Sequence, residues 1–96
     1  YQVTIYDRYD RPGGLLIYGI PNFKLEKFVV ERRTKLLKDS GIKFVQNFEV
    51  GKDKTLYDLK EMHDAILIAT GVYKAREIDI PGHKLQNIFP TEVIHF

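Results

Sequence analysis

A short, almost wholly apolar run constrains the fold of this chain most strongly. It reads Asp64-Ala65-Ile66-Leu67-Ile68-Ala69 and is followed at once by Thr70-Gly71. A continuous apolar run of this length, without alternation, is typical of a parallel strand that is covered on both faces. We therefore expect a strand over residues 64–69, at the centre of a sheet.

The rest of the chain alternates between strand and helix patterns. Residues 3–6 and 42–48 are rich in β-branched and aromatic residues, whereas residues 25–38 carry apolar residues at near-helical intervals before Gly41. Thr55 and Asp58 have the spacing of a helix-opening cap, which predicts a short helix. This alternation favours an α/β fold with a mainly parallel sheet. Ligands bind at the carboxyl ends of such strands, where Asp7 and Thr70-Gly71 are expected to lie.

Length and composition limit the classes of function. The chain has 96 residues, enough for one modest domain, and its hydrophobic fraction of 44% is ordinary for a globular protein. A net charge of +2 points to neither nucleic acid nor an anionic membrane as a partner. The absence of cysteine excludes thiolate ligation of zinc or an iron–sulfur cluster by this stretch. No apolar run is long enough to span a bilayer, and we expect a soluble piece of a cytoplasmic protein.

Asp7 is the first candidate for ligand binding. It directly follows the expected strand over residues 3–6. An acidic residue at the end of the second strand of a dinucleotide-binding unit accepts hydrogen bonds from a ribose hydroxyl. Asp7 could instead only end the strand or cap a turn, and its position alone leaves both interpretations open.

Two glycine-containing segments extend this candidate site. Arg11-Pro12-Gly13-Gly14 combines a cation, a rigid turn and two residues without a Cβ, which lets backbone N–H groups approach a diphosphate. Thr70-Gly71 would let the backbone pack closely against a ring system. Each segment could equally be structural, as a Pro-Gly turn and as the end of a strand. Because no Gly-x-Gly-x-x-Gly motif follows a strand, we expect that this stretch cannot bind a dinucleotide completely.

Other chemistries find little support in the sequence. His63, His83 and His95 lack metal-ligand spacing and an evident carboxylate partner, and we expect them at the surface or in packing. The single serine, Ser40, lies beside Gly41 and belongs to no triad pattern. The basic residues of the expected helix should form a solvated face; they are Arg32, Arg33, Lys35 and Lys38. We predict no catalytic residue and no metal site.

Several motifs in a fixed order carry a resemblance to a known family. They are Val3-Thr4-Ile5-Tyr6-Asp7-Arg8-Tyr9-Asp10-Arg11-Pro12-Gly13-Gly14-Leu15-Leu16, Tyr18-Gly19-Ile20-Pro21-Asn22-Phe23-Lys24-Leu25, Asn47-Phe48-Glu49-Val50-Gly51 and Ala69-Thr70-Gly71-Val72-Tyr73-Lys74-Ala75-Arg76. From Val3 to about Ile88, the chain resembles the small subunit of glutamate synthase. The resemblance implies a partial Rossmann-like FAD-binding domain. We expect residues 1–96 to be an internal fragment of it, with residues 83–96 as a tail of uncertain structure.

The resemblance also implies where the chain would meet FAD. By motif position, the cofactor-binding residues would be Asp7 at the adenosine ribose, Arg11, Gly13, Gly14 and Leu15 along the FAD, Lys24 at the flavin side, Val50 at the adenine, and Ala69, Thr70 and Gly71 where the chain turns beside the cofactor. In that family NADPH is oxidised at FAD, and electrons pass through iron–sulfur clusters to a large subunit that forms glutamate from glutamine and 2-oxoglutarate. The NADPH site, the clusters and the glycine-rich turn would lie outside the matching segment.

Two alternatives remain open from the sequence. One is a related flavin enzyme that resembles this stretch less closely, such as the electron-input half of a dihydropyrimidine dehydrogenase or an NADPH–ferredoxin transhydrogenase. The other is a folded fragment or interaction module without a cofactor. Since the phosphate-binding loop is absent from the sequence, we expect the isolated chain to be colourless and inactive with NADPH. Exposed sheet edges should favour its self-association.

Overall fold

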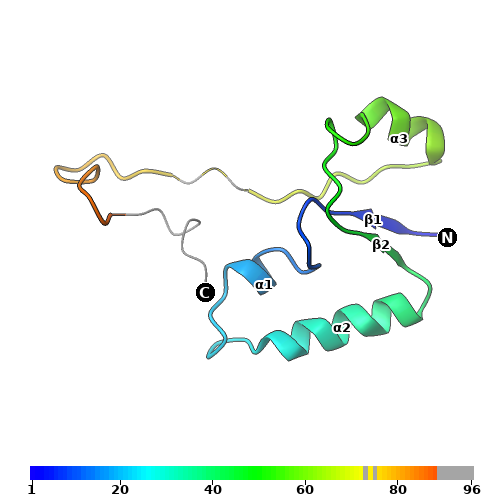
Figure 1. Ribbon diagram of the computed structural model, residues 1–96, viewed down its shortest axis with the longest axis horizontal. Coiled ribbons are helices and arrows are strands. Elements are labelled where there is room, and N and C mark those ends of the chain that lie inside the picture. The colour runs from blue at the N-terminus through cyan, green and yellow to red at the C-terminus, as the bar shows by residue number, and fades with distance from the viewer. Residues whose placement is uncertain (73, 75, 89–96) are drawn as a thin grey trace.

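The computed structural model describes residues 1–72, 74 and 76–88, and contains two strands and three helices among them. In chain order these are β1 (Thr4–Tyr6), α1 (Leu15–Tyr18), α2 (Lys27–Asp39), β2 (Lys43–Val45) and α3 (Leu56–Met62). Figure 1 shows α1 and α2 on one side of the strand pair and α3 on the other. Within the described residues, no helix is both long and apolar enough to cross a membrane.

β1 and β2 form a parallel pair, as the sequence predicts for an α/β fold. Ile5 faces Phe44 in the register, and Tyr6 faces Val45. The ladder continues past the strand ends, because the Asp7 N–H donates to the carbonyl of Val45 at 3.0 Å and the carbonyl of Asp7 accepts from the Phe48 N–H at 2.9 Å. The strand itself spans Lys43–Val45 and is shorter than the predicted range of 42–48. A parallel pair needs a crossover connection, which α1 and α2 provide.

α2 confirms the helix that is expected near residues 25–38. It begins at Lys27, after the extended residue Glu26, and ends at Asp39. Gly41 follows with φ of +100°, a conformation that glycine adopts at little steric cost at the end of a helix. The buried face of α2 is narrow, since Val30 is its one residue below a tenth exposed among those the structure describes. The cationic residues at positions 32, 33, 35 and 38 are exposed, as predicted for a solvated face.

The capping box at the start of α3 is confirmed. The Thr55 hydroxyl accepts a hydrogen bond from Asp58 N–H at 3.1 Å, and the Asp58 carboxylate accepts one from Thr55 N–H at 2.9 Å. These two bonds satisfy donors that a helix start would otherwise leave without partners. The helix buries Leu59, which is 4% exposed.

α1 is a single helical turn that the sequence analysis did not predict. Its buried residue Ile17 is 3% exposed and lies close to Val30 of α2, since both side chains approach Gly13. A helix of four residues spans little more than one turn and so shows no hydrophobic period. It forms because Gly14 turns the chain into it and because Ile17 packs toward α2.

The expected central strand over residues 64–69 is wrong for this chain. These residues are not paired with either strand of the described sheet, and Leu67 and Ile68 are 90% and 67% exposed. Figure 1 shows this segment leaving the end of α3 as an extended connection. A buried central strand requires hydrogen-bonding neighbours at both edges, and the described residues supply none beside it. Thr70 and Gly71 consequently do not follow a strand.

The chain also turns where Pro81-Gly82 predicts. His83 N–H donates to the carbonyl of Ile80 at 3.3 Å, and Leu85 N–H donates to that of Gly82 at 3.1 Å. Of the expected tail over residues 83–96, the part beyond Ile88 lies outside the described residues, as do Tyr73 and Ala75.

Candidate functional site

Asp7 lies at the carboxyl end of β1, the position that the sequence predicts. Its Oδ1 accepts a hydrogen bond from Tyr9 N–H at 3.0 Å, which closes a local turn. Within the described part of the chain, its Oδ2 atom makes no hydrogen bond. The side chain is half-buried. Asp7 therefore caps its own turn with one oxygen and keeps the other available to a ligand.

The loop after Asp7 is held in place by the segment that follows β2. Tyr9 supplies its carbonyl to two donors, Gln46 Nε2 at 3.0 Å and Asn47 N–H at 2.9 Å. Asn47 adopts a positive φ of 55°, which asparagine tolerates better than most residues. These bonds join two loops at the same edge of the sheet. The position of Asp7 is thus fixed from both strands.

Gly13 and Gly14 have different surroundings. A Cβ on Gly13 would lie 2.6 Å from Ile17 Cγ1 and 2.9 Å from Val30 Cγ1, so this glycine permits the close approach of the loop to the core. A Cβ on Gly14 would meet nothing within 4 Å, and its φ is +53°. Among the described residues, the N–H groups of Gly13, Gly14 and Leu15 make no hydrogen bond. Three backbone N–H groups without a described acceptor therefore lie at or beside Gly14, which faces open space.

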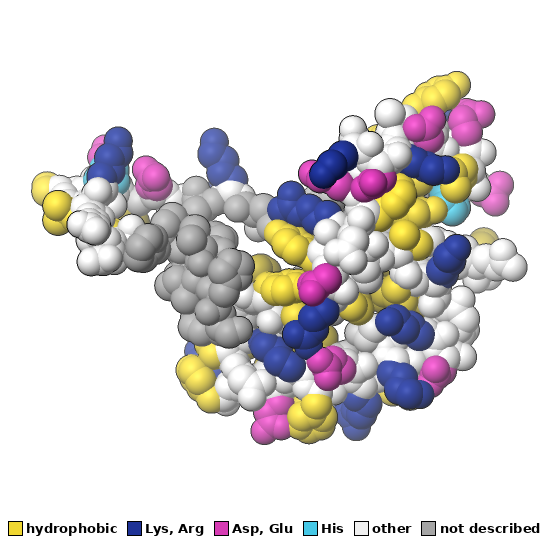
Figure 2. Space-filling model, in the orientation of Figure 1, with side chains coloured by type: hydrophobic (Ala, Val, Ile, Leu, Met, Phe, Trp, Pro, Cys, Tyr) yellow, Lys and Arg dark blue, Asp and Glu magenta, His cyan; other side chains and the backbone are white. Residues whose placement is uncertain are grey.

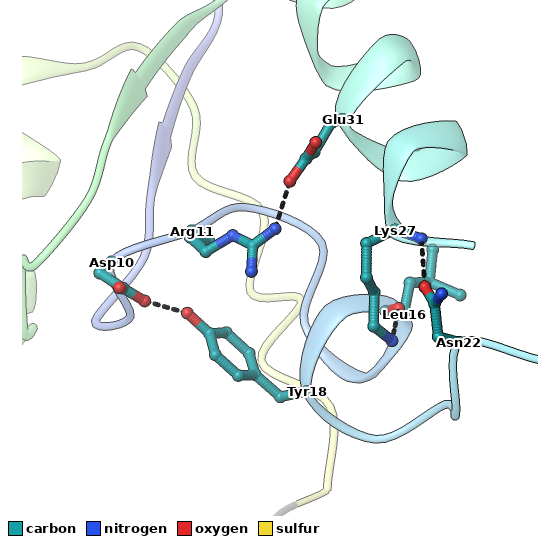
Figure 3. Close-up of polar contacts among 7 residues, drawn as sticks. All are labelled: Asp10, Arg11, Leu16, Tyr18, Asn22, Lys27 and Glu31. Atoms are coloured by element: carbon teal, nitrogen blue, oxygen red, sulfur yellow. Dashed lines mark hydrogen bonds and ion pairs between the residues drawn. The ribbon is translucent and has the colours of Figure 1, made fainter. Parts of the chain in front are cut away.

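Arg11 points toward α2, as Figure 3 shows. Its guanidinium pairs with the carboxylate of Glu31, and the two side chains are 43% and 57% exposed. An exposed pair of this kind is worth little in stability and is easily exchanged for another anion. Arg11 and Glu31 together tie the loop after β1 to the first half of α2.

A second pair closes the loop between β1 and α1. The Tyr18 hydroxyl donates to Asp10 Oδ1, and the Tyr18 ring lies 5.1 Å from the Tyr9 ring. Desolvation, followed by the hydrogen bond from Tyr18 to Asp10, raises the pKa of Tyr18 above its ordinary value. The hydroxyl therefore stays protonated and keeps donating at neutral pH.

Lys24 and Lys27 lie near each other in sequence but differ in what they contact. Lys24 is exposed, and no described group hydrogen-bonds or ion-pairs with its ammonium. Lys27 Nζ donates to the carbonyls of Leu16, at 3.2 Å, and Ile20, and its backbone N–H donates to Asn22 Oδ1 at 3.0 Å (Figure 3). Of these two ammonium groups, that of Lys24 has no partner among the described residues and that of Lys27 is engaged.

Val50 and residues 69–71 lie apart from this loop in their contacts, whereas Leu15 directly follows it. Val50, 46% exposed, forms an isolated bridge with Lys54 shortly after β2. Ala69, Thr70 and Gly71 are exposed on the extended connection, and Gly71 has φ of +71°. Leu15 opens α1 and is 57% exposed. The described structure therefore gathers Asp7 and the glycine pair into one loop but does not join residues 69–71 to them through a sheet.

The histidines follow the sequence analysis in part. His63 packs as expected, with Nε2 at 3.0 Å from the Tyr6 hydroxyl. His83 contradicts the expectation that it lacks carboxylate partners, because its ring nitrogens lie 3.9 Å from Glu77 Oε2 and 3.9 Å from Asp79 Oδ1. The Pro81-Gly82 turn folds His83 back toward these residues, which spacing alone did not reveal. His95 lies outside the described residues.

Comparison with known proteins tests the resemblance. No family model matches the chain. It is 64% identical over 88 residues to the glutamate synthase [NADPH] small chain of Azospirillum brasilense, and 51% identical over 88 residues to that of Bacillus subtilis. Each match covers 92% of this chain and 18% of the relative. The chain is homologous to a segment of glutamate synthase small chains. The resemblance predicted from the sequence is thereby confirmed.

A more distant relative bears on the alternatives. The putative oxidoreductase AegA of Escherichia coli is 40% identical over 87 residues, which is 91% of this chain and 13% of that protein. The chain therefore spans less than a fifth of the length of each of these relatives. Their names place the matched segment in oxidoreductases, and the higher identities belong to glutamate synthases.

Sequence reasoning missed the residues that hold the loop after β1 and the loop before α2 in shape. Asn22 and Lys27 form one such contact, and Arg11 with Glu31 forms another. Asn22 precedes a helix and could have been noticed as a capping residue, although Glu26 is the N-cap position. No local pattern signals that Lys27 reaches back to residues 16 and 20, because that contact depends on how the loop folds.

Proposed function

We propose that this chain is part of the FAD-binding region of a glutamate synthase small chain, an enzyme that oxidises NADPH. The observation that carries the proposal is the 64% identity to such a small chain over nearly the whole of this sequence. The fold supports it, since β1, α2 and β2 form a parallel strand–helix–strand unit with Asp7 at the carboxyl end of β1. We propose a partial Rossmann-like domain on this basis.

The residues of the loop after β1 fit the adenosine diphosphate half of FAD. The uncommitted Oδ2 of Asp7 suits a ribose hydroxyl, which needs an acceptor. The three uncommitted N–H groups from Gly13 to Leu15 suit phosphate oxygens, which accept hydrogen bonds from backbone donors. The absence of a Cβ at Gly14 leaves room for a ligand to reach the backbone. The proposed fit to FAD depends mainly on Asp7 and Gly14.

The remaining assigned positions are proposals of the same kind. Arg11 would exchange its exposed contact with Glu31 for the cofactor, Leu15 would pack against it, and Lys24 would approach the flavin side. Val50 would meet the adenine through its backbone, and residues 69–71 would turn the chain beside the cofactor. Residues 69–71 would reach that position once a neighbouring strand pairs with residues 64–69.

FAD, when bound, supplies the two-electron acceptor for NADPH. The residues of this chain bind and orient the cofactor, and none of them has to transfer a proton in hydride transfer, which depends on the alignment of two rings. We propose that electrons then pass through iron–sulfur clusters outside this segment to a large subunit, where glutamate is formed from glutamine and 2-oxoglutarate. We assign no catalytic residue to this chain.

The second candidate is a related flavin oxidoreductase with a different electron acceptor. The 40% identity to the putative oxidoreductase of Escherichia coli supports this candidate. The same loop would bind FAD in either enzyme. The acceptor partner, rather than the cofactor, separates the two.

A segment exchange tests the proposal directly. The 88 matched residues of the Azospirillum brasilense small chain would be replaced by the corresponding residues of this chain, and the chimeric protein purified with and without the large subunit. We expect the chimera to retain FAD, measured by flavin absorbance after denaturation, and to support NADPH-dependent glutamate formation.

The control for this exchange is the corresponding segment of the Bacillus subtilis small chain. It tests whether the host protein tolerates a grafted segment. If the Bacillus segment retains FAD while the segment from this chain gives a folded protein without flavin, the proposal is wrong. Retention of FAD with loss of glutamate formation in the complex with the large subunit would favour the second candidate.

A further inference from the structure

Lys27 is engaged at two places on the loop that precedes α2. Its ammonium donates to the carbonyl of Leu16 in α1 and to that of Ile20 beyond it, while its backbone N–H donates to the side-chain oxygen of Asn22. Figure 3 shows the Lys27 side chain running from the start of α2 toward Leu16, with Asn22 beside its backbone. One residue thus closes the chain from residue 16 to residue 27 into a loop.

The chemistry of α1 explains why a cation is needed at this point. The N–H groups of Gly19 and Ile20 both donate to the carbonyl of Leu15, so the turn leaves the carbonyl of Leu16 to another donor. Carbonyls at the end of a helical turn carry partial negative charge, and a lysine ammonium offers up to three donors to them. The bond to Ile20 is partly buried, which strengthens it relative to an exposed one.

Lys24 lies inside the loop that Lys27 closes. The turn around it is held by Lys24 N–H and Leu25 N–H, which both donate to the carbonyl of Pro21, at 3.0 Å and 3.2 Å. Pro21 in turn follows Ile20, whose carbonyl Lys27 holds. Any movement of Lys27 would therefore shift the turn from which the free ammonium of Lys24 extends.

We propose that Lys27 is a positioning residue, which fixes the turn that presents Lys24 to the flavin. This inference rests on the proposed function, because it assigns Lys24 to the flavin side. Lys27 acts through the main-chain carbonyls of residues 16 and 20 and does not itself touch the cofactor. This role differs from general stabilisation of the fold, because it affects only the turn that carries Lys24 and the placement of the Lys24 ammonium.

A double-mutant cycle in the chimera described above tests the inference. Lys24→Met, Lys27→Met and the double variant would be compared by FAD content, thermal midpoint and the rate of flavin reduction by NADPH in stopped flow. Since a small misplacement of a positioned group can cost up to about a hundredfold in rate, we expect Lys27→Met to slow flavin reduction about tenfold with FAD content unchanged. In the Lys24→Met background, the same substitution should change the rate less than about twofold.

Three further comparisons separate positioning from general stabilisation. Lys27→Met should lower the thermal midpoint equally in both backgrounds, because the bonds to residues 16 and 20 are lost in each. Lys27→Arg keeps a cation with several donors and should restore most of the rate. Lys60→Met, which removes an exposed ammonium from α3, is the matched control and should leave the rate unchanged.

The outcomes distinguish this inference from the proposed function. An equal loss of rate from Lys27→Met in both backgrounds, or no loss in either, would overturn the positioning role while FAD remained bound. Lys24→Met without any effect on flavin reduction would also overturn it, since Lys27 would then have nothing to position. A folded chimera that contains no FAD would instead reject the proposed function.

Discussion

Gly13 and Gly14 are adjacent in sequence but have opposite surroundings, one packed and one open. Gly13 lets the loop after β1 press against Ile17 and Val30, and its φ of +125° adds a backbone reason for glycine. Gly14 faces open space. The sequence treats the two as one motif for approach to a diphosphate, whereas the structure assigns core packing to the first and leaves the second facing open space.

Alanine at position 13 is expected to destabilise the fold. The added Cβ would overlap Ile17, and overpacking together with an unfavourable φ costs about 2–3 kcal/mol. Gly41→Ala is the matched control, because Gly41 also has a positive φ of +100° but nothing within 4 Å of an added Cβ. Urea denaturation followed by helical circular dichroism should show a loss of about 1 kcal/mol for that control. Equal losses for the two variants would contradict the packing role of Gly13.

The capping box gives α3 a measurable dependence on pH. The hydrogen bond from Thr55 N–H, followed by that from the Thr55 hydroxyl, lowers the pKa of Asp58 below its ordinary value of 3.8. A group with a lowered folded pKa stabilises the fold above its unfolded pKa, and this stabilisation is lost as the pH falls through the folded value. The start of α3 should therefore loosen in acid below about pH 4.

Thr55→Ala is expected to weaken this dependence, because the bond from the Thr55 hydroxyl is lost while that from the backbone N–H of residue 55 remains. Loss of the cap should cost α3 about 1 kcal/mol, and the pKa of Asp58 should rise toward its ordinary value. An NMR titration of the Asp58 carboxyl carbon, with amide exchange of α3, measures both effects. Thr55→Ser keeps the hydroxyl and serves as the control. An unchanged titration of Asp58 in Thr55→Ala would show that the Thr55 hydroxyl does not lower the pKa of Asp58.

The elements that the sequence predicts well are those set by local interactions. The strand after Val3, the helix before Gly41 and the cap at Thr55 all depend on residues within a few positions of one another. Residues 64–69 differ, because an apolar run becomes a strand only when other strands pair with it. Lys27 and Arg11 were missed as loop contacts for a related reason, since their partners are brought near by folding and not by spacing.

The chain as a whole buries unusually little surface. Its accessible area is 8625 Å², against roughly 5,700 Å² for a compact protein of this mass. The radius of gyration of 16.9 Å likewise exceeds the value of about 12.5 Å for a compact domain of this length. In Figure 2, hydrophobic side chains lie at the surface among interspersed cationic and acidic ones. This exposure fits a segment whose core is completed by other parts of a larger protein.

Self-association of the isolated chain is expected for the same reason. Unpaired extended segments with exposed apolar residues pair readily with other chains. Leu67→Lys places a charge on the most exposed large apolar residue of the 64–69 run and should weaken the association measured by sedimentation velocity. Leu85→Lys is the control, since Leu85 is also exposed but lies in the turn after Gly82. A monomeric parent chain over the whole concentration range, or equal effects of both variants, would contradict this prediction.

The FAD affinity of the chimera with a substitution at Asp7 tests the central claim most directly. Asp7→Asn keeps the oxygen that accepts from Tyr9 N–H but removes the charge, and Asp10→Asn makes the same change three residues further along the loop. Loss of a hydrogen bond to a charged group costs about 1.5–3 kcal/mol, so fluorescence titration of the apoprotein should show FAD binding weakened by roughly tenfold to a hundredfold for Asp7→Asn. Asp10→Asn should bind FAD almost as tightly as the parent chimera. Equal affinity for Asp7→Asn and the parent would contradict the assignment of Asp7 to the cofactor.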